Sequence, residues 1–277
     1  MFFKYDGCDI YYEISGEVGT PVLMLHGFGC DYRLMRGCME PVFENNEKYR
    51  RVYVDLPGHG KSGAKLDLAS SDKILDCVLA LMDKLFPHEK FLVCGESYGG
   101  YIALGVICAR PQQCCGVNLI CPLTVDSLAD LDAEKGNLIV RDNSYLDSLT
   151  FEQRESFMAM ATRADKLTGN RFFTEDAPGF ALGNSEFMQA IDEHFPLSCG
   201  IDSVLSRHPY ASPALILCGR QDSIVGYRDQ QRLVDLMPRC TYVILDIAGH
   251  NLQIEHRTLM VALVRDWLNR VELAFSE

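Results

Sequence analysis

The chain has 277 residues, 48% of them hydrophobic and 23% charged, so it can bury a full core and has the composition of a globular protein. Its net charge of −12 argues against nucleic-acid partners and against binding to anionic membrane surfaces. No apolar run approaches the length that spans a bilayer, and the first residues lack the basic and apolar regions of a signal peptide. We therefore expect a soluble, cytoplasmic protein.

Twelve cysteines raise the question of a metal site or of disulfides. They form no C-x-x-C pair and no Cys/His cluster with zinc spacing. Several of them, such as Cys94, Cys121 and Cys218, fall within apolar segments, where cysteine behaves as a small hydrophobic residue. We expect reduced thiols, with no metal site and no disulfide.

The predicted secondary structure begins with a hairpin and then alternates between strands and helices. The hairpin joins strands near 2–5 and 9–14 through Asp6-Gly7. Nearly continuous apolar runs, typical of strands covered on both faces, follow at 22–26, 51–56, 91–94, 117–121, 214–218 and 241–247. Amphipathic segments predict helices at 72–86, 98–110, 227–237 and 258–275. The pattern predicts the α/β class, with a doubly wound, mostly parallel sheet of eight strands.

One segment, residues 124–210, interrupts this alternation. It contains no strong strand pattern, only helical segments such as 148–167 and 185–194, so we expect a helical insertion packed over the sheet edge. The domain organisation predicted is a core of residues 1–123 and 211–277 with the insertion between them. Residues 122–210 carry 15 acidic and 7 basic side chains. These charges would disfavour anionic substrates if the insertion overhangs an active site, although most acidic segments are simply solvated.

Residues 95–99 read Gly-Glu-Ser-Tyr-Gly and lie between an apolar strand and an apolar helix. A serine on such a sharp strand-to-helix turn has its hydroxyl exposed above the sheet edge, where a substrate can reach it. The backbone there is strained and crowded, so the flanking positions must be small, as Gly95 and Gly99 are. We predict that Ser97 is a nucleophile.

A serine hydroxyl needs a base, and the base needs a carboxylate to orient it. On this kind of sheet the expected chain order is serine, acid, histidine. Asp222 and His250 both follow strands at the edge that bears the serine, and they are the acid and base predicted. Asp126 follows the preceding strand and competes with Asp222 for the role of the acid.

The other histidines fit the role of the base less well. His26 and His59 precede the serine and lie in glycine-rich turns, where we expect structural roles, and His256 falls at the final helix. The turn that contains His26 also offers a backbone amide, that of Phe28, which could help to bind an oxyanion. The second donor predicted is the amide of Tyr98, the residue after the nucleophile.

Together these motifs resemble the α/β-hydrolase superfamily over nearly the whole chain. The motifs that carry the resemblance are His26-Gly27-Phe28-Gly29, Asp55-Leu56-Pro57-Gly58-His59-Gly60-Lys61-Ser62, Gly95–Gly99, Gly219–Asp222 and Gly249-His250. The resemblance implies that residues 124–210 form a helical cap that lines the substrate pocket. It also implies a serine hydrolase, because related dehalogenases and epoxide hydrolases carry aspartate where this chain has Ser97.

The resemblance does not specify a substrate. We expect hydrolysis of a small carboxylic ester or a related acyl compound through an acyl-enzyme, with no metal or organic cofactor. Because the insertion is acidic, we expect a neutral or cationic small molecule as the substrate. Two other enzyme activities stay open: a proline iminopeptidase, since Ser-Tyr-Gly-Gly looks like some of those enzymes, and a carbon–carbon bond hydrolase. A ligand sensor with slow turnover is an alternative of another class, and no pattern indicates the oligomeric state.

Overall fold

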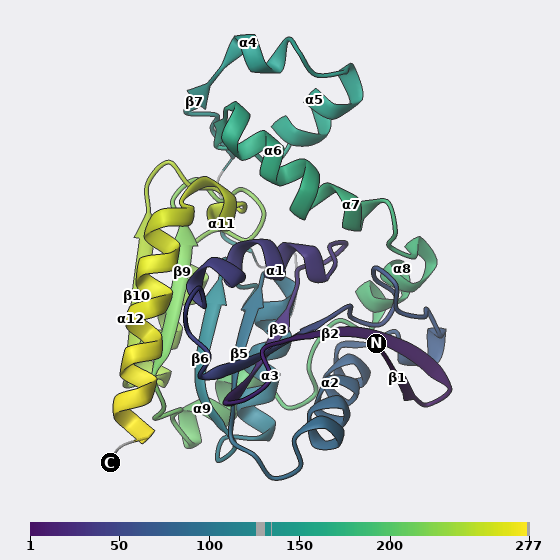
Figure 1. Cartoon of the computed structure of the whole chain (residues 1–277), viewed down its shortest axis with the longest axis vertical. Coiled ribbons are helices and arrows are strands. Elements are labelled where there is room, and N and C mark those ends of the chain that lie inside the picture. Colours follow the sequence, from purple (N-terminus) through teal and green to yellow (C-terminus); the bar gives the residue numbers. More distant parts are fainter. Residues whose placement is uncertain (126–130, 134, 276–277) are drawn as a thin grey trace.

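The structure, a computed structural model, describes residues 1–125, 131–133 and 135–275, and its centre is one sheet of eight strands (Figure 1). The order across the sheet is β1-β2-β4-β3-β5-β6-β9-β10. These strands are β1 (Phe2–Tyr5), β2 (Cys8–Ser15), β3 (Thr20–Leu25), β4 (Tyr49–Val54), β5 (Phe91–Glu96), β6 (Cys114–Ile120), β9 (Ala214–Gly219) and β10 (Cys240–Leu245). β2 pairs antiparallel with β1 and with β4, and the other neighbours pair in parallel. The predicted fold class is confirmed.

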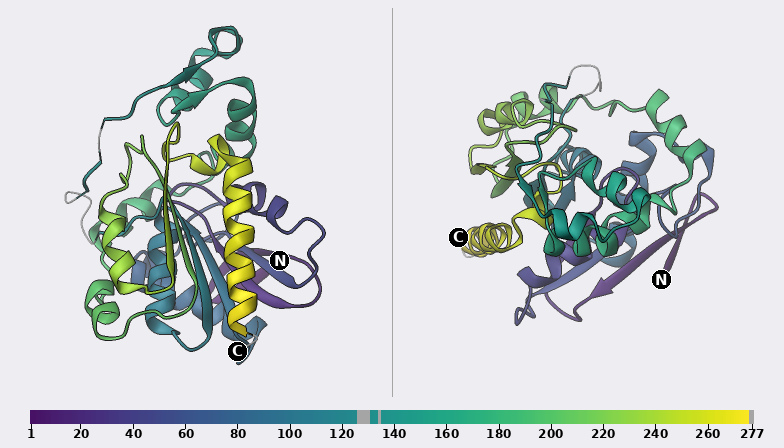
Figure 2. Two further views of the ribbon diagram at one scale, coloured as in Figure 1. Left: turned by 90° about the vertical axis from the view of Figure 1, so that its left-hand side faces the viewer. Right: turned by 90° about the horizontal axis from the view of Figure 1, so that it is seen from above.

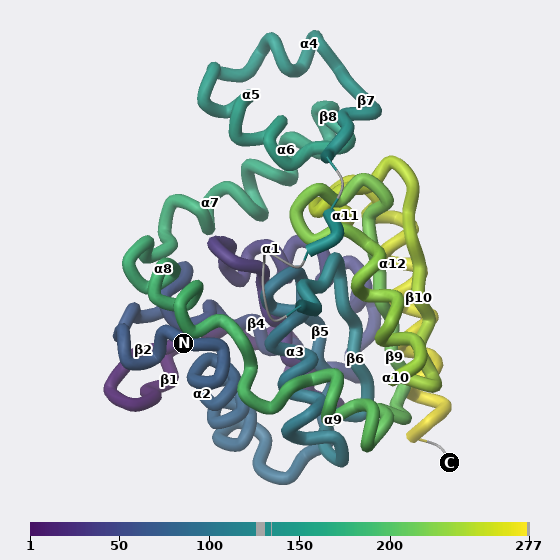
Figure 3. Tube along the Cα trace, turned by 180° about the vertical axis from the view of Figure 1, so that it is seen from behind, coloured from purple at the N-terminus to yellow at the C-terminus, as the bar shows by residue number. Residues whose placement is uncertain are grey.

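Helices cover both faces of the sheet, as a doubly wound fold requires. Figures 2 and 3 show α1 and α12 on one face and α2, α3, α9 and α10 on the other. These helices are α1 (Tyr32–Met39), α2 (Ser71–Leu85), α3 (Tyr98–Ala109), α9 (Ile201–Arg207), α10 (Leu233–Leu236) and α12 (Arg257–Phe275), with α11 (Leu252–Glu255) just before α12. Short 3-10 turns lie at Glu40–Val42, Leu66–Leu68 and Asp229–Arg232. The helix predicted over 227–237 is therefore wrong in extent, because a 3-10 turn occupies its first half.

The core follows from the apolar patterns of the sequence. All six residues of β5 are buried, as expected for a central strand covered by helices on both faces. α2 begins after a serine cap, where the Ser70 side chain accepts a hydrogen bond from the Lys73 amide, and it buries Ile74, Val78 and Leu81. At the other face, Trp267 of α12 is fully buried and its indole N–H donates to the Pro213 carbonyl. Burial of these faces holds the sheet edge that carries the site in place.

The inserted segment stands beyond one end of the sheet, above α1 and α11 (Figure 1). Its described elements are β7 (Val140–Arg141), α4 (Asn143–Leu146), α5 (Phe151–Met158), β8 (Arg163–Ala164), α6 (Lys166–Glu175), α7 (Ala177–Phe180) and α8 (Ser185–Glu193), followed by α9, which lies on a face of the sheet. The upper part has a small core of its own, built on Leu146, Phe157 and Phe172. The helix predicted over 148–167 is wrong in extent: Thr150 caps a short α5, and the chain then forms β8, which pairs with β7.

Within these described ranges, no helix combines the length and the apolar character needed to cross a membrane.

Candidate active site

Ser97 occupies the strand-to-helix turn predicted for a nucleophile. It follows β5, precedes α3, and has φ 53° and ψ −117°, a conformation that L-residues with side chains rarely adopt. A Cβ on Gly95 would collide with the backbone of Gly99, and a Cβ on Gly99 would collide with Leu25. The predicted need for small residues on both sides of the serine is therefore confirmed by the packing.

Three side chains from separate loops form a continuous chain of hydrogen bonds. The Ser97 Oγ lies 2.9 Å from His250 Nε2, and His250 Nδ1 lies 2.9 Å from Asp222 Oδ2. The second oxygen of Asp222 accepts hydrogen bonds from the amides of Ile224 (2.9 Å) and Val225 (3.0 Å). With the carboxylate accepting from Nδ1–H, Nε2 is left to accept the serine proton.

Electrostatics favour an ionised Asp222 in this arrangement. Burial on its own would raise the pKa of its carboxyl group, but His250 and the two loop amides outweigh that effect and lower the pKa. The alternative acid, Asp126, lies outside the described residues.

The histidines expected to be structural have that character. His26 donates from Nδ1 to the Gly27 carbonyl (2.8 Å) and accepts at Nε2 from the Leu56 amide (3.0 Å), so both ring nitrogens are used. Burial, with His59 nearby, lowers the pKa of His26 to about 3 and keeps it neutral. His59 is also buried, and its Nδ1 donates to the Pro57 carbonyl (2.9 Å).

Two backbone amides beside the serine are free to bind an oxyanion. Among the described residues, neither the Phe28 amide nor the Tyr98 amide has a hydrogen-bond acceptor. The two aromatic rings meet edge to face, with centroids 5.6 Å apart. This contact ties the turn after β3 to the start of α3, next to Ser97.

Sequence reasoning missed two carboxyl groups whose charges act on His250. Glu96 lies inside the serine motif, is buried, accepts a hydrogen bond from the Gly27 amide, and places Oε1 3.5 Å from His250 Nε2. Asp176, between α6 and α7, is also buried, and neither of its carboxyl oxygens has a partner among the described residues. Glu96 could have been found from the sequence, because a charged residue directly after a buried apolar strand is unusual. No local pattern in the sequence indicates Asp176.

These carboxyl groups change the protonation of the site. Burial raises the pKa of Glu96 to about 7, against the opposing effect of His250, and raises the pKa of Asp176 well above its usual range. Burial would lower the pKa of His250, but Asp222, Glu96 and Asp176 outweigh it and raise the value to about 9. The imidazole is thus surrounded by three acidic groups.

A cavity of about 330 Å³ opens onto the serine hydroxyl. Its walls are mostly apolar, with Phe28, Leu123 and Phe195 among them. Asp192 of α8 also lines this cavity and is exposed. Among the described residues that line the cavity, it is the one with a charged side chain. A cavity of this size suits a small molecule rather than a macromolecular substrate.

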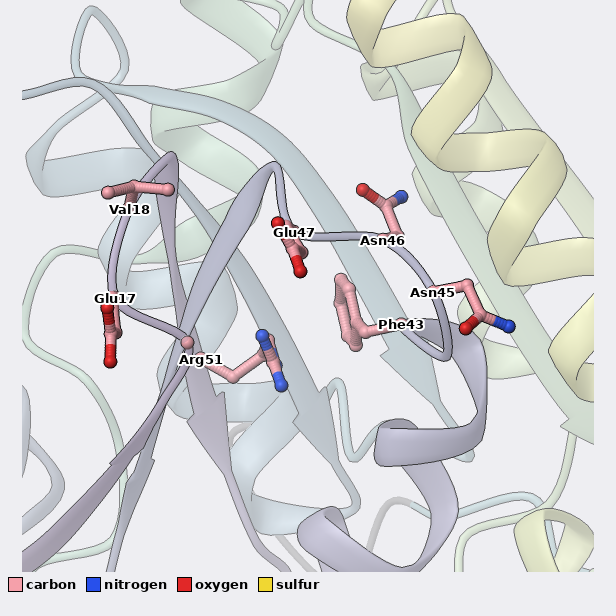
Figure 4. Close-up of a pocket in the computed structure, with 8 residues that line it drawn as sticks. Glu17, Val18, Phe43, Asn45, Asn46, Glu47 and Arg51 are labelled. Atoms are coloured by element: carbon pink, nitrogen blue, oxygen red, sulfur yellow. The ribbon is translucent and has the colours of Figure 1, made fainter.

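A larger hollow, about 540 Å³, lies at the opposite edge of the sheet, near the amino ends of β3 and β4 (Figure 4). Its single basic side chain, Arg51, already donates to the Glu40 carboxylate (3.0 and 3.2 Å) and to the Tyr49 carbonyl (2.8 Å). Because the Arg51 guanidinium already has these partners, the hollow does not offer a reactive group comparable to Ser97.

Cys121, Asp222 and His250 could each offer one metal-ligand atom, and these atoms lie within 4.8 Å of one another. The side chains are committed otherwise, because His250 uses both ring nitrogens in the hydrogen-bond chain. The Cys121 thiol donates to the Gly249 carbonyl (3.6 Å), and burial raises its pKa well above the usual range. The geometry fits hydrogen bonding better than metal ligation.

The family model for the alpha/beta hydrolase fold matches residues 20–257, and the chain belongs to that family. The dihydrolipoyllysine-residue acetyltransferase component of an acetoin cleaving system from Pseudomonas putida is 29% identical over 245 residues, which are 88% of this chain and 62% of that protein. The chain thus spans less than two thirds of that relative.

A relative of similar length is a pimeloyl-[acyl-carrier protein] methyl ester esterase from Aliivibrio salmonicida (strain LFI1238). It is 27% identical over 263 residues, which cover 89% of this chain and 91% of that protein. Among solved structures, an alpha/beta superfamily hydrolase from Oenococcus oeni PSU-1 aligns with a TM-score of 0.87 and 25% identity, covering 95% of this chain and 96% of that chain. The protein therefore belongs to the alpha/beta hydrolase fold family and has an esterase among its relatives.

Proposed function

We propose that the protein is a serine hydrolase that cleaves a small carboxylic ester or a related acyl compound. The observation that carries the proposal is the chain of hydrogen bonds from Ser97 through His250 to Asp222, with Ser97 lining a cavity of about 330 Å³. The esterase relative of similar length supports the same reaction class.

In the proposed mechanism, Ser97 Oγ attacks the carbonyl carbon while His250 Nε2 takes its proton. Asp222 stabilises the imidazolium, and the Phe28 and Tyr98 amides bind the negative oxygen of the tetrahedral intermediate. His250 then gives the proton to the leaving alcohol, which leaves an acyl group on the serine. Water attacks this acyl-enzyme with His250 again acting as the base, and the acid product and the free serine are released.

Residues 124–210 would act as the cap of this active site, and Asp192 would set its charge preference. Asp192 is on α8 of this segment and lines the cavity. Its negative charge would disfavour a carboxylate on the substrate and would favour a neutral or cationic acyl group. The same charge keeps an aminopeptidase-like activity on a substrate with a free amine as a second candidate.

The test is labelling with a fluorophosphonate probe together with hydrolysis of p-nitrophenyl acetate. Wild-type protein should react at Ser97, and Ser97→Ala should lose both labelling and hydrolysis. Labelling that persists in Ser97→Ala would overturn the proposal. A panel of neutral esters, amino-acid amides and dienoic keto-acids then separates the ester, amide and carbon–carbon activities, and labelling without turnover on any of them would indicate a ligand sensor.

A further inference from the structure

A buried carboxylate outside the hydrogen-bond chain joins the loop of the catalytic histidine to the inserted segment. Glu255, at the end of α11, is 5% exposed. Its Oε2 accepts from the Gly249 amide (2.7 Å), one residue before His250. Its Oε1 accepts from the amides of Thr162 (2.7 Å) and Arg163 (2.9 Å) in the inserted segment.

Close packing at the same point leaves no space between the two segments. A Cβ on Gly249 would lie 2.5 Å from Thr162 Oγ1, whereas its next neighbours would be 3.5 and 3.6 Å away. The Thr162 carbonyl in turn accepts from the amides of Ile139 and Val140, the start of β7. The Glu255 carboxylate therefore connects the histidine loop to the two-stranded sheet of the insertion.

Two further contacts fix α11 to the inserted segment. Arg171 of α6 is buried and donates from Nη1 to the carbonyls of Gln253 (2.7 Å) and Ile254 (3.3 Å), while Glu175 pairs with the same guanidinium. Ile254 also packs into the small core of the insertion. The short helix after His250 is thus packed as part of the insertion, although it belongs to the other end of the chain.

We propose that Glu255 is a positioning residue for catalysis, which holds the His250 loop against the inserted segment so that the base stays aligned between Ser97 and Asp222. The proposal rests on the proposed role of His250 as the base. Glu255 itself touches no reacting atom. Its effect passes through the Gly249 amide, which fixes where the next residue places its imidazole.

The first experiment compares Glu255→Gln with Asp165→Asn, using p-nitrophenyl acetate. Glutamine keeps one acceptor oxygen, but its NH2 group replaces the other oxygen of Glu255 and faces a backbone N–H, which is also a donor. The hydrogen bonds on that side, either to Gly249 or to Thr162 and Arg163, are therefore lost. Displacement of the base by a fraction of an ångström should lower kcat by up to roughly 10²-fold and leave KM nearly unchanged. Asp165, which pairs with Arg163 in the same part of the insertion, is the matched control, and its variant should keep the wild-type kcat.

A second pair of variants tests the same contact without changing Glu255. Gly249→Ala should lower kcat because its Cβ collides with Thr162 Oγ1. Thr162→Ala removes the oxygen with which the new methyl group collides. The double variant Gly249→Ala/Thr162→Ala should therefore recover most of the lost kcat. Failure of this rescue would overturn the proposal even if Glu255→Gln proved too unstable to assay.

A readout without turnover separates this proposal from the proposed function. The proton between His250 Nδ1 and Asp222 should give a far-downfield ¹H signal, assigned by its loss in Asp222→Asn. Glu255→Gln should broaden or shift this signal while the fold is retained, whether or not the protein hydrolyses esters. An unchanged signal with wild-type kcat, or an equal loss of kcat in Asp165→Asn, would overturn the role of Glu255.

Discussion

Replacing Glu96 by glutamine should move the acid limb of the pH profile to lower pH. The glutamine keeps an acceptor for the Gly27 amide but removes the charge that faces His250 across 3.5 Å. His250 can act as a base only when it is neutral, and its raised pKa of about 9 keeps it protonated over much of the neutral range. Loss of a neighbouring negative charge favours the neutral imidazole, so activity should appear at lower pH.

The size of the shift follows from the distance. Two unit charges 3.5 Å apart at an effective dielectric constant of about 20 interact by about 5 kcal/mol, which sets an upper limit of about 3.5 pKa units. Glu96 is itself only partly ionised near neutrality, because burial raises its pKa to about 7, and the two groups titrate as a coupled pair. We therefore expect a shift of about 1–2 units in the acid limb of kcat/KM.

The assay is kcat/KM for a neutral p-nitrophenyl ester from pH 5 to 10 at constant ionic strength. The acid limb of kcat/KM reports the pKa of the base in the free enzyme. Asp55→Asn is the matched control, because Asp55 is another buried acid with a pKa raised by burial to about 6, and it is not among the groups that shift His250. Its acid limb should coincide with that of the wild type. An unmoved limb in Glu96→Gln, or one that moves to higher pH, would refute the electrostatic reasoning.

Three other substitutions test separate parts of the site. Asp222→Asn should lower kcat by roughly 10²–10⁴-fold because the amide sets the wrong tautomer of His250, and a wild-type kcat in this variant would assign the acid elsewhere. Asp192→Asn should raise kcat/KM severalfold for an ester with a free carboxylate relative to its neutral analogue, and added salt should reduce this effect by screening. The control Glu193→Gln, one residue further along the chain, should leave the ratio of the two kcat/KM values unchanged. Equal ratios in both variants would show that Asp192 does not face the substrate. Asp176→Asn should raise the free energy of unfolding at pH 7 by about 1–3 kcal/mol, measured by urea denaturation, because the buried carboxyl has no partner among the described residues. Its pKa is raised on folding, so the ionised form opposes folding above the ordinary pKa, and the advantage of the variant should vanish as the pH falls toward about 4.

Much of the fold was readable from local patterns. Continuous apolar runs marked the buried parallel strands, and amphipathic segments marked α2 and α12, because burial on one or both faces dictates residue type along the chain. The insertion was harder, since its short elements are stabilised by contacts with distant parts of the chain. The stretch 159–164, for example, continues a helical pattern but leaves the helix to pair with β7 and to meet Glu255.

The sequence by itself determined the position of the serine turn, because an apolar strand, a serine flanked by glycines and an apolar helix follow one another along the chain. The crowding that requires glycine at Gly95 comes from the start of α3, and at Gly99 it comes from Leu25 of β3. The order of motifs was also enough to predict Asp222 and His250. Only the tertiary structure decided what surrounds them: Glu96 and Asp176 beside the imidazole, and Glu255 between the histidine loop and the insertion. Such carboxyl groups leave no periodic pattern, because their partners are backbone amides or rings far away in the chain, which only the folded arrangement brings within a few ångströms.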